Sequence, residues 1–556
     1  MSKAMTTMSV ARERQLDWLL GELLGGGVMR AEPSLLRART RHPHARWITA
    51  ALAVLAAATA LGVALLAGHE RARDAQQPAP PVDWYEAHGP ASIGSIPAGV
   101  VNLRCYDFDD DALAHIPHFA KLERLDLSGM DVNAQGYAVS LKISDAGLAH
   151  LAGLPDLRWL SLAGCHEVKG TGFVALEALP MLEHLDLTYT GVESPAVERL
   201  DRLASLRELS LSYCMGFHGR SLAEVAKIPG LRRLELRGCT TLSARDVAQL
   251  AKLSELRYLD LRDCQGRFRG QTASGFSAGG EEPPPPPVQD GIGITDASVA
   301  ALAGLKLETL LLGGSESLTD AIGETLAKMP TLRSLDLSNL PKATGALLAK
   351  VPPDLESLAL DENPQFGAAA LRQLPKLSQL REWGLSGLPP LGTEDLGALL
   401  RGKSLHVLRL SGTVAKGKAL EVFLDNKGQL TADAGAIVAR QSELRRLELA
   451  NVRSIDAAFL RELTELPRLA ELDLTSSAVG SVETMTALAS CRALRSLKLT
   501  WCKKLDLAGL EALAGAPLQE LDLYGTNLKP EEVHDVAKAW PGCLIKMPKG
   551  QRYRAP

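Results

Sequence analysis

The sequence predicts an α/β protein: a right-handed, curved solenoid with a parallel inner sheet and outer helices, preceded by one transmembrane helix. The first observation is a nine-residue pattern that recurs three times in succession, as L-R-E-L-S-L-S-Y-C from Leu206, L-R-R-L-E-L-R-G-C from Leu231 and L-R-Y-L-D-L-R-D-C from Leu256. The second is an uninterrupted apolar run, Trp47 to Ala67. The third is composition: 46% of residues are hydrophobic but only 4% are aromatic, which favours many small Leu- and Ala-filled layers over one globular core.

Residues 1–46 are expected to form a basic cytoplasmic head. They contain eight Lys or Arg and four Asp or Glu. Leucines between Val10 and Leu24 recur at helical spacing and three glycines follow, which predicts a short amphipathic helix. Two interpretations remain open: a solvated tail beside the membrane, or a docking helix for a cytoplasmic partner.

The apolar run from Trp47 to Ala67 is long enough to cross a ~30 Å hydrocarbon core as a helix. A cleaved signal peptide is the alternative, but the head before the run is too long for an ordinary one. Arg37, Arg39 and Arg41 lie on its N-terminal side, whereas acidic and basic residues are mixed after it. By the positive-inside rule we expect a single-pass membrane protein with its N-terminus in the cytoplasm and its large C-terminal part outside.

Residues 68–83 are expected to be a Pro-rich linker, and residues 84–556 one repeat domain. After a degenerate copy from Val100, the unit L-x-x-L-x-L recurs with a period of about 25 residues. The copies begin at Leu122, Leu157, Leu182, Leu206, Leu231, Leu256, Leu307, Leu332, Leu355, Leu380, Leu405, Leu444, Leu469, Leu494 and Leu518. Regular copies of this length predict a stack of identical coils.

This unit, with Cys at its ninth position and continued by segments such as I-T-D-A-S-V-A-A-L-A-G-L from Ile294, resembles the cysteine-containing subtype of leucine-rich repeat. The resemblance covers about four fifths of the chain. Together with the apolar run, it makes the chain similar to bacterial membrane-anchored leucine-rich-repeat proteins. Richness in Ala, Leu and Gly also favours a high-GC bacterium. The resemblance implies the fold and is almost silent on function.

Each repeat is expected to form a short strand followed by a helix. The fourth and sixth positions alternate as in a strand, so they face the core while the residue between them faces the inner surface. Ser144, Thr295 and Thr319 are candidate helix caps. The ninth position holds Cys in some copies and Thr or Asn in others, which predicts a small side chain with a weak polar contact under a turn, rather than a disulfide or metal ligand.

Insertions interrupt the period around Asn133 to Ser140, around Ala415 to Leu430 and at residues 265–291. The last insertion is rich in Gly and contains the run Pro283 to Pro287, so we expect a flexible loop, with a polyproline ligand as the alternative. The acidic run from Asp107 to Asp111 is expected to be a solvated capping turn rather than a cation site.

The sequence favours no enzyme. The twelve histidines are scattered, and H-E-x-x-H does not occur. We expect no catalytic residue, no cofactor and no metal site. Outside the head there are 53 basic and 61 acidic residues, which argues against a nucleic-acid partner and favours a protein or peptide ligand of basic or polar character.

The inner face of the sheet is the candidate binding surface. The residue between the two strand leucines is often acidic, and aromatic residues of four successive copies are expected to project inward beside these carboxylates. Packing on neighbours and solvated, Arg-paired carboxylates are the alternatives. The candidate residues are Trp159, His184, Asp186, Tyr189, Tyr213, Glu235, Tyr258 and Asp260.

We therefore expect a non-catalytic recognition scaffold displayed from a membrane. One alternative is a transmembrane signalling relay, because the head resembles those of bacterial anti-sigma-like membrane proteins; no Cys precedes Cys105, so a zinc-binding form of that head is excluded. Another alternative is a substrate-recognition accessory of a ligase or protease complex. The ligand itself is not encoded in any motif.

Overall fold

The computed structural model describes residues 84–128, 142–265, 293–415, 418–420, 430, 432–452 and 455–556. All of them belong to one compact unit. The expected head, the apolar run from Trp47 to Ala67 and the Pro-rich linker lie outside these ranges, as does nearly all of the insertion at 265–291. Among the described residues, no helix combines the length and apolarity needed to cross a membrane.

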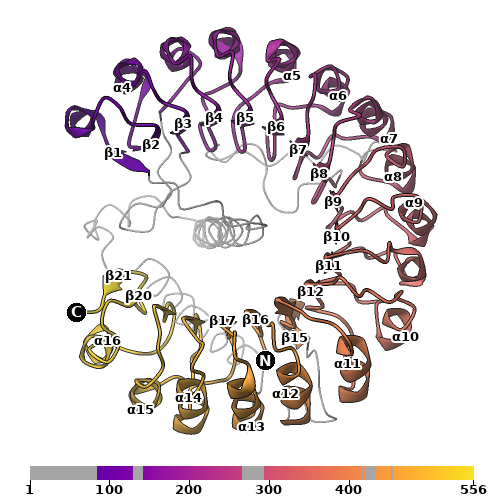
Figure 1. Cartoon of the computed structure of the whole chain (residues 1–556), viewed down its shortest axis with the longest axis vertical. Helices are drawn as coiled ribbons and strands as arrows, with labels where there is room; N and C mark the ends of the chain where they lie inside the picture. Colours follow the sequence, from indigo (N-terminus) through magenta and orange to yellow (C-terminus); the bar gives the residue numbers. More distant parts are fainter. Residues whose placement is uncertain are drawn as a thin grey trace, which may run out of the picture. The chain divides into compact units, whose positions relative to one another are not determined.

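Short strands form one long parallel sheet, which lines the inner side of the solenoid (Figure 1). Each strand pairs with the strand of the next coil, and only the last pair is antiparallel. Within the described part, the nineteen strands of this sheet are β1 Tyr85–His88, β2 Asn102–Tyr106, β3 Arg124–Asp126, β4 Trp159–Ser161, β5 His184–Asp186, β6 Glu208–Ser210, β7 Arg233–Glu235, β8 Tyr258–Asp260, β9 Thr309–Leu311, β10 Ser334–Asp336, β11 Ser357–Ala359, β12 Glu382–Gly384, β13 Val407–Arg409, β16 Arg446–Glu448, β17 Glu471–Asp473, β18 Ser496–Lys498, β19 Glu520–Asp522, β20 Leu544–Lys546 and β21 Arg552–Arg554.

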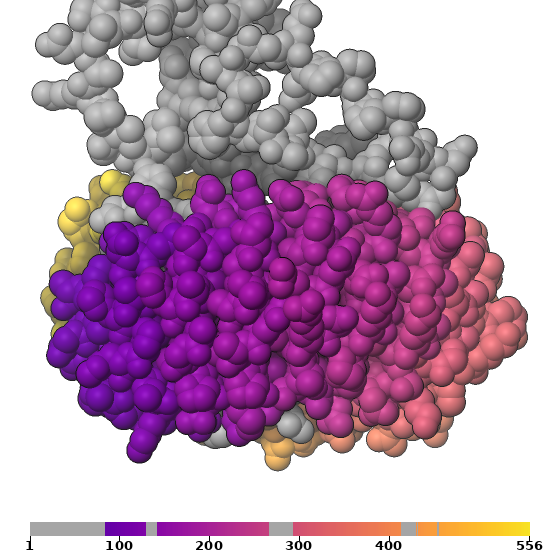
Figure 2. All heavy atoms as spheres, turned by 90° about the horizontal axis from the view of Figure 1, so that it is seen from above, coloured from indigo at the N-terminus to yellow at the C-terminus, as the bar shows by residue number. Residues whose placement is uncertain are grey.

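Helices occupy the outer side, and most are one or two turns long because each coil has few residues left after its strand (Figure 1). Figure 2 shows the successive coils packed side by side across the outer surface. The α-helices are α4 Asp110–Leu113, α5 Ser194–Val197, α6 Leu222–Val225, α7 Ala244–Val247, α8 Asp296–Ala301, α9 Gly323–Leu326, α10 Ala368–Leu371, α11 Thr393–Leu400, α12 Ala432–Ala439, α13 Ala457–Glu462, α14 Val482–Ala489, α15 Leu507–Ala512 and α16 Pro530–Ala537. Short 3₁₀ helices, including Gly147–Gly153, Thr171–Ala178 and Ala346–Lys350, fill the same place in other coils.

The predicted register is confirmed. Leu209 of β6, Leu234 of β7 and Leu259 of β8 align across neighbouring strands, and all three are buried. Leu259 pairs directly with Leu310 of β9, so the insertion between these coils leaves the ladder unbroken. The longer coil after β13 also leaves the ladder unbroken, because β13 pairs directly with β16. Strands β14 (Thr413–Ala415) and β15 (Lys418–Leu420) form a separate antiparallel hairpin.

Two elements extend the array beyond the predicted copies. Strand β1 pairs with β2 and adds a coil before the one that begins at Val100. At the other end, β20 follows the copy that begins at Leu518, and β21 folds back against it. Neither end carries the L-x-x-L-x-L unit, so sequence pattern alone did not indicate them. Both flank the core with a less regular layer, as terminal coils of solenoids do.

In most described coils the ninth position is a buried polar slot, as predicted, whereas Leu340, Leu388 and Val452 fill it in three others. The Cys214 Sγ donates to the Leu187 carbonyl oxygen of the preceding coil at 3.0 Å, and the Cys502 Sγ donates to that of Leu474 at 3.1 Å. In the same slot, Asn363 Nδ2 donates to the Leu337 carbonyl at 2.9 Å. All eight cysteines are free thiols and buried.

Two of the three predicted helix caps are confirmed. Thr295 accepts a hydrogen bond from the Ser298 amide, and Thr319 accepts one from Ala321. The prediction for Ser144 was wrong: its hydroxyl accepts from the Ala146 amide, but the helix Gly147–Gly153 begins after Ala146 and has no side-chain cap. In the acidic run, Asp109 caps α4 by accepting from the Ala112 amide at 2.9 Å, so this segment is a capping turn.

Candidate binding surface

Six large side chains form a continuous row on the inner face, at the third position of successive coils. Their strands pair in register, which brings equivalent side chains within about 5 Å of each other along the sheet. We call this row the inner-face ladder; it consists of Arg124, Trp159, His184, Glu208, Arg233 and Tyr258. Three of its members, Trp159, His184 and Tyr258, were predicted from the sequence.

The ladder is held by contacts between neighbours. The Trp159 and His184 rings stack with centroids 5.1 Å apart, and His184 Nδ1 lies 2.9 Å from Glu208 Oε2. The Arg233 guanidinium lies over the Tyr258 ring at 3.5 Å from its centroid. Aromatic stacking and cation–π contacts each contribute roughly 0.5–1.5 kcal/mol. The ladder is thus pre-ordered rather than a set of independent side chains.

The ladder carries charges of both signs. The hydrogen bond with His184 lowers the pKa of Glu208, burial opposes this, and the positive charges of His184, Arg233 and Arg124 lower it further. Arg124 also lies over the Trp159 ring, at 5.8 Å from its centroid. The surface therefore offers aromatic faces flanked by fixed charges of both signs.

Trp84 extends the aromatic end of the ladder, and the sequence did not indicate it. Its ring meets Trp159 edge-on with centroids 5.7 Å apart, and the Arg104 guanidinium lies 5.0 Å from the Trp84 centroid. Trp84 precedes β1, outside any recognisable repeat copy. Only the extra N-terminal coil reveals this contact.

The predicted positions of Tyr189 and Tyr213 were wrong. Both were expected on strand faces, but β5 ends at Asp186 and β6 at Ser210, so each tyrosine lies in the turn after its strand. Their rings stack on each other in a parallel arrangement, with centroids 4.5 Å apart and an interplanar angle of 2°. This pair, the tyrosine stack, forms a second aromatic feature beside the inner-face ladder.

The backbone explains the displacement. Tyr189 and Tyr213 occupy the eighth position of their coils and have φ of 57°, in the left-handed region. All nine non-glycine residues with positive φ in the described part hold this position, and in several other coils it is Gly, Asn or Asp. There the chain turns while its amide still donates to the next coil, as from Tyr189 to the Ser212 carbonyl at 2.9 Å. Alternation along the strand ends before this turn.

The acidic residues at the fifth position have a local structural role. Asp186 accepts a hydrogen bond from the Thr188 amide at 3.0 Å, and Asp260 accepts one from the Arg262 amide at 2.9 Å. Such a carboxylate satisfies a backbone donor two residues later, as Asx turns do. This contact recurs in other coils, at Asp126, Asp336, Asp473 and Asp522.

Most of these carboxylates are also paired with cations. Glu235 lies 2.7 Å from Arg233, and the buried Asp260 lies 2.5 Å from the buried Arg262. Arg233 and Arg262 thus pair with carboxylates of the inner face, whereas Arg257 lies near Glu255 instead. The inner face is therefore largely charge-compensated, and its aromatic and mixed-charge row is its more distinctive feature.

A weaker aromatic group lies near the C-terminal end. The Trp501 and Tyr524 rings meet edge-on at 5.5 Å, with Lys503 and Lys546 each 4.8 Å from one ring. Among the described residues, no group of three or more His, Cys, Asp or Glu side chains is placed to hold a metal ion.

Parallel coils, inner strands, outer helices and the buried ninth-position slot define this chain as a leucine-rich-repeat solenoid. No protein-family model matches the sequence, and no curated protein does. Among solved structures, it is similar to an internalin from Listeria monocytogenes at 18% identity, covering 69% of this chain and 82% of the other with a TM-score of 0.33. It is also similar to the TLR13 chain of a complex with ssRNA13 at 18% identity, covering 79% and 60% with a TM-score of 0.35. Because the sequence identities and TM-scores are this low, the assignment as a leucine-rich-repeat solenoid depends on the strand register and repeat pattern of this chain itself.

Proposed function

We propose that this protein is a non-catalytic recognition scaffold whose inner face binds a protein or peptide ligand, and that it is displayed from a membrane. The supporting observation is the inner-face ladder, in which Trp159, His184 and Tyr258 remain half-buried at the surface. A chain with only 4% aromatic residues has several of them on adjacent strands. Rigid, partly exposed aromatic residues flanked by charges are common anchors of protein interfaces.

Ligand capture by the full chain tests this role. The chain, purified from membranes, serves as bait, and the captured polypeptides are identified by mass spectrometry. Combined Trp159→Ala and Tyr258→Ala substitutions should reduce capture at least tenfold, because interface aromatics often contribute 2 kcal/mol or more. Trp501→Ala removes an aromatic residue from a distant coil and serves as the control. Undiminished capture by the double variant would reject the inner face as the binding surface.

The membrane part of the proposal rests on the apolar run from Trp47 to Ala67 and the arginines before it. A reporter fused after Pro556 distinguishes the two topologies. Alkaline phosphatase should be active there and a cytoplasm-dependent fluorescent protein dark, because the repeat domain is proposed to lie outside the cytoplasm. The reverse pattern would show that the proposed orientation is wrong.

A further inference from the structure

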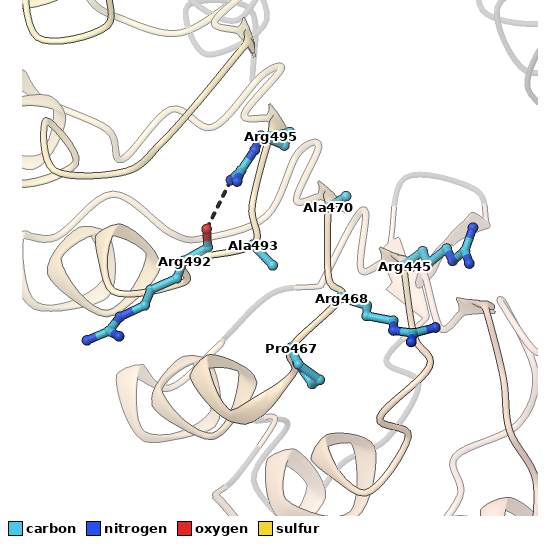
Figure 3. A pocket seen from close by; sticks show the side chains of 7 residues that line it. All are labelled: Arg445, Pro467, Arg468, Ala470, Arg492, Ala493 and Arg495. Carbon is cyan, nitrogen blue, oxygen red and sulfur yellow. Dashed lines mark hydrogen bonds between the residues drawn. The ribbon is translucent and has the colours of Figure 1, made fainter.

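A shallow groove lined by arginines crosses the strand-entry edge of three coils near the C-terminal end, away from the inner-face ladder. It spans the coils of β16, β17 and β18 and has a volume of about 510 Å³ (Figure 3). Its lining residues are Arg445, Pro467, Arg468, Ala470, Arg492, Ala493 and Arg495.

The repeat register explains why a groove exists here. Arg445, Ala470 and Arg495 each stand directly before the strand residues Arg446, Glu471 and Ser496, which pair in register. Because neighbouring strands are about 4.8 Å apart, the two arginine stems are about 10 Å apart. The methyl group of Ala470 leaves the space between them open.

The groove has an excess of positive charge. Arg468 forms an ion pair with Glu443, the only carboxylate that pairs with a lining residue in the described part of the chain. Arg495 Nη1 donates to the Arg492 carbonyl at 3.0 Å and to that of Leu494 at 2.8 Å. The side chains of Arg445 and Arg492 are exposed and have no hydrogen-bond or ion-pair partner among the described residues.

Other coils show what a purely structural arginine does in this position. Arg207, Arg257 and Arg333 precede their strands as Arg495 does, and each donates to carbonyls of the adjoining turn. This satisfies carbonyls at the end of the outer helix. Arg495 has the same structural role, because it also donates to carbonyls of the adjoining turn. Among the described residues, Arg445 and Arg492 donate to no such carbonyl, so this structural role does not explain the presence of arginine at these two positions.

The pKa of the nearby His406 is affected by the positive charge of the same arginines. Burial lowers the pKa of His406, and the positive charges of Arg381, Arg445 and Arg468 lower it further, although Glu443 partly opposes them. His406 precedes β13, the strand next to β16. The local field is therefore positive over more than one coil.

We propose that the groove formed by Arg445, Arg468, Arg492 and Arg495 binds a phosphate group, either as the free anion or as a phosphomonoester of another molecule. A phosphomonoester carries a charge of about −1.5 to −2 and three strong acceptor oxygens. Planar guanidinium groups match these oxygens with paired N–H donors, and Arg clusters are the usual way in which proteins hold phosphate. Pro467, Ala470 and Ala493 are the small residues that line the groove between the arginines.

Isothermal titration of the full chain with inorganic phosphate, and separately with a phosphoserine peptide, tests the site. At low ionic strength we expect saturable one-site binding that weakens as salt is added. Arg445→Ala and Arg492→Ala should each weaken it roughly tenfold, since one charge-assisted hydrogen bond contributes about 1.5–3 kcal/mol. Ala470→Glu should abolish it by placing a carboxylate in the groove.

Arg333→Ala is the matched control, because it removes an arginine from the equivalent position of another coil; phosphate affinity should not change. Binding of phosphate without the peptide assigns the free anion, and binding of both assigns a monoester. The proposal fails if neither ligand binds, or if the Arg445→Ala/Arg492→Ala double variant binds as the unmodified chain does. Both side chains are exposed, so circular dichroism should show an unchanged fold in these variants.

Discussion

Asp361 and Arg409 form an ion pair across a whole coil that lies between them. Asp361 follows β11 and Arg409 ends β13, yet Arg409 Nη2 lies 3.4 Å from Asp361 Oδ2. The strand between them, β12, ends in Gly384, where a Cβ atom would lie 2.2 Å from Asp361 Oδ2 and 2.6 Å from Arg409 Nη2. Because Gly384 has no side chain, the Asp361 carboxylate and the Arg409 guanidinium can contact each other across β12. Both side chains are largely buried, so neither can exchange this partner for bulk water.

Gly384→Ala should separate this pair and destabilise the surrounding coils. The added methyl group overpacks the site at a cost of about 1–3 kcal/mol, and it leaves two buried charges less well paired. Hydrogen exchange of amides in β11, β12 and β13 measures the effect locally, because solenoids can open coil by coil. Gly304→Ala is the control, since a Cβ atom at Gly304 would have no heavy atom within 4 Å beyond its chain neighbours. Equal protection in both variants would contradict the proposed role of Gly384.

Gly238→Ala should disturb the tyrosine stack from beneath. Gly238 occupies the eighth position with φ of 71°, and a Cβ atom there would lie 2.3 Å from the Tyr213 ring. The left-handed backbone alone costs an alanine about 1–2 kcal/mol, and the overlap with the ring adds to this. The loss should be smaller by about 1 kcal/mol when Tyr213 is already alanine, which a double-mutant cycle measures by urea unfolding. Equal losses in both backgrounds would mean that the ring gives way freely.

Cys502→Ala should destabilise the protein by about 1–2 kcal/mol, because it removes a buried sulfur and the donor to the Leu474 carbonyl. Cys502→Thr should cost less, since Thr190 and Thr526 fill the same slot and their hydroxyls find acceptors within their own coils, the carbonyls of Leu187 and Leu523. Urea midpoints compare the two variants. A threonine variant less stable than the alanine variant would show that the slot does not select for a hydrogen-bond donor.

The same burial predicts a loss of stability in alkali. Burial raises the pKa of the Cys214 thiol to about 11 and that of Cys502 to about 12, from an ordinary value of 9.0. The unfolded thiols ionise at lower pH than the folded ones, so this contribution is complete below about pH 9 and is lost as pH rises toward 11 or 12. Urea midpoints should therefore fall above pH 9. A variant with serine at both positions should show a shallower decline, which separates the thiols from lysines that ionise in the same range.

The strand register was predictable because leucine spacing determines which side chains face the core. A shift of one residue would expose Leu209, Leu234 and Leu259 together, so only one register is compatible with the pattern. The tyrosine stack was not predictable from Tyr189 and Tyr213 alone, because tyrosine gives no signal for a left-handed turn. Aligning the copies would have supplied one: Gly238, Asp263 and other residues typical of positive φ hold the same position.

The arginine groove was not predictable from any single repeat copy. Arg445 and Arg495 resemble the structural arginines of other coils, and nothing in their own copies marks them. The informative residue is Ala470, a small side chain where neighbouring coils have arginine. Three stacked copies must be compared before the hollow between two cations becomes visible. The inner-face ladder depends on the same comparison, since Glu208 and Arg233 connect the predicted aromatic residues only through their neighbours.

Asp320 should stabilise two adjacent coils above its pKa and cease to do so in acid. Its carboxylate accepts hydrogen bonds from the Thr344 amide at 2.9 Å and hydroxyl at 2.7 Å, and from the amides of Gly345 at 3.1 Å and Leu347 at 3.0 Å. Burial would raise the pKa of Asp320, but these hydrogen bonds outweigh it and lower the pKa below its ordinary value of 3.8.

Because the folded state holds the ionised form, the contribution is present above about pH 4 and is lost as pH falls through the lowered pKa. Asp320→Asn should therefore cost about 1–2 kcal/mol at neutral pH. The amide group has only one oxygen that accepts, and its nitrogen donates, so it cannot accept all four hydrogen bonds. The difference from the unmodified chain should shrink near pH 2, where the aspartic acid is protonated as well. Asp354→Asn, at an exposed position, controls for the general loss of one negative charge. A penalty for Asp320→Asn that is the same at both pH values would show that the hydrogen-bonded carboxylate charge is not its source.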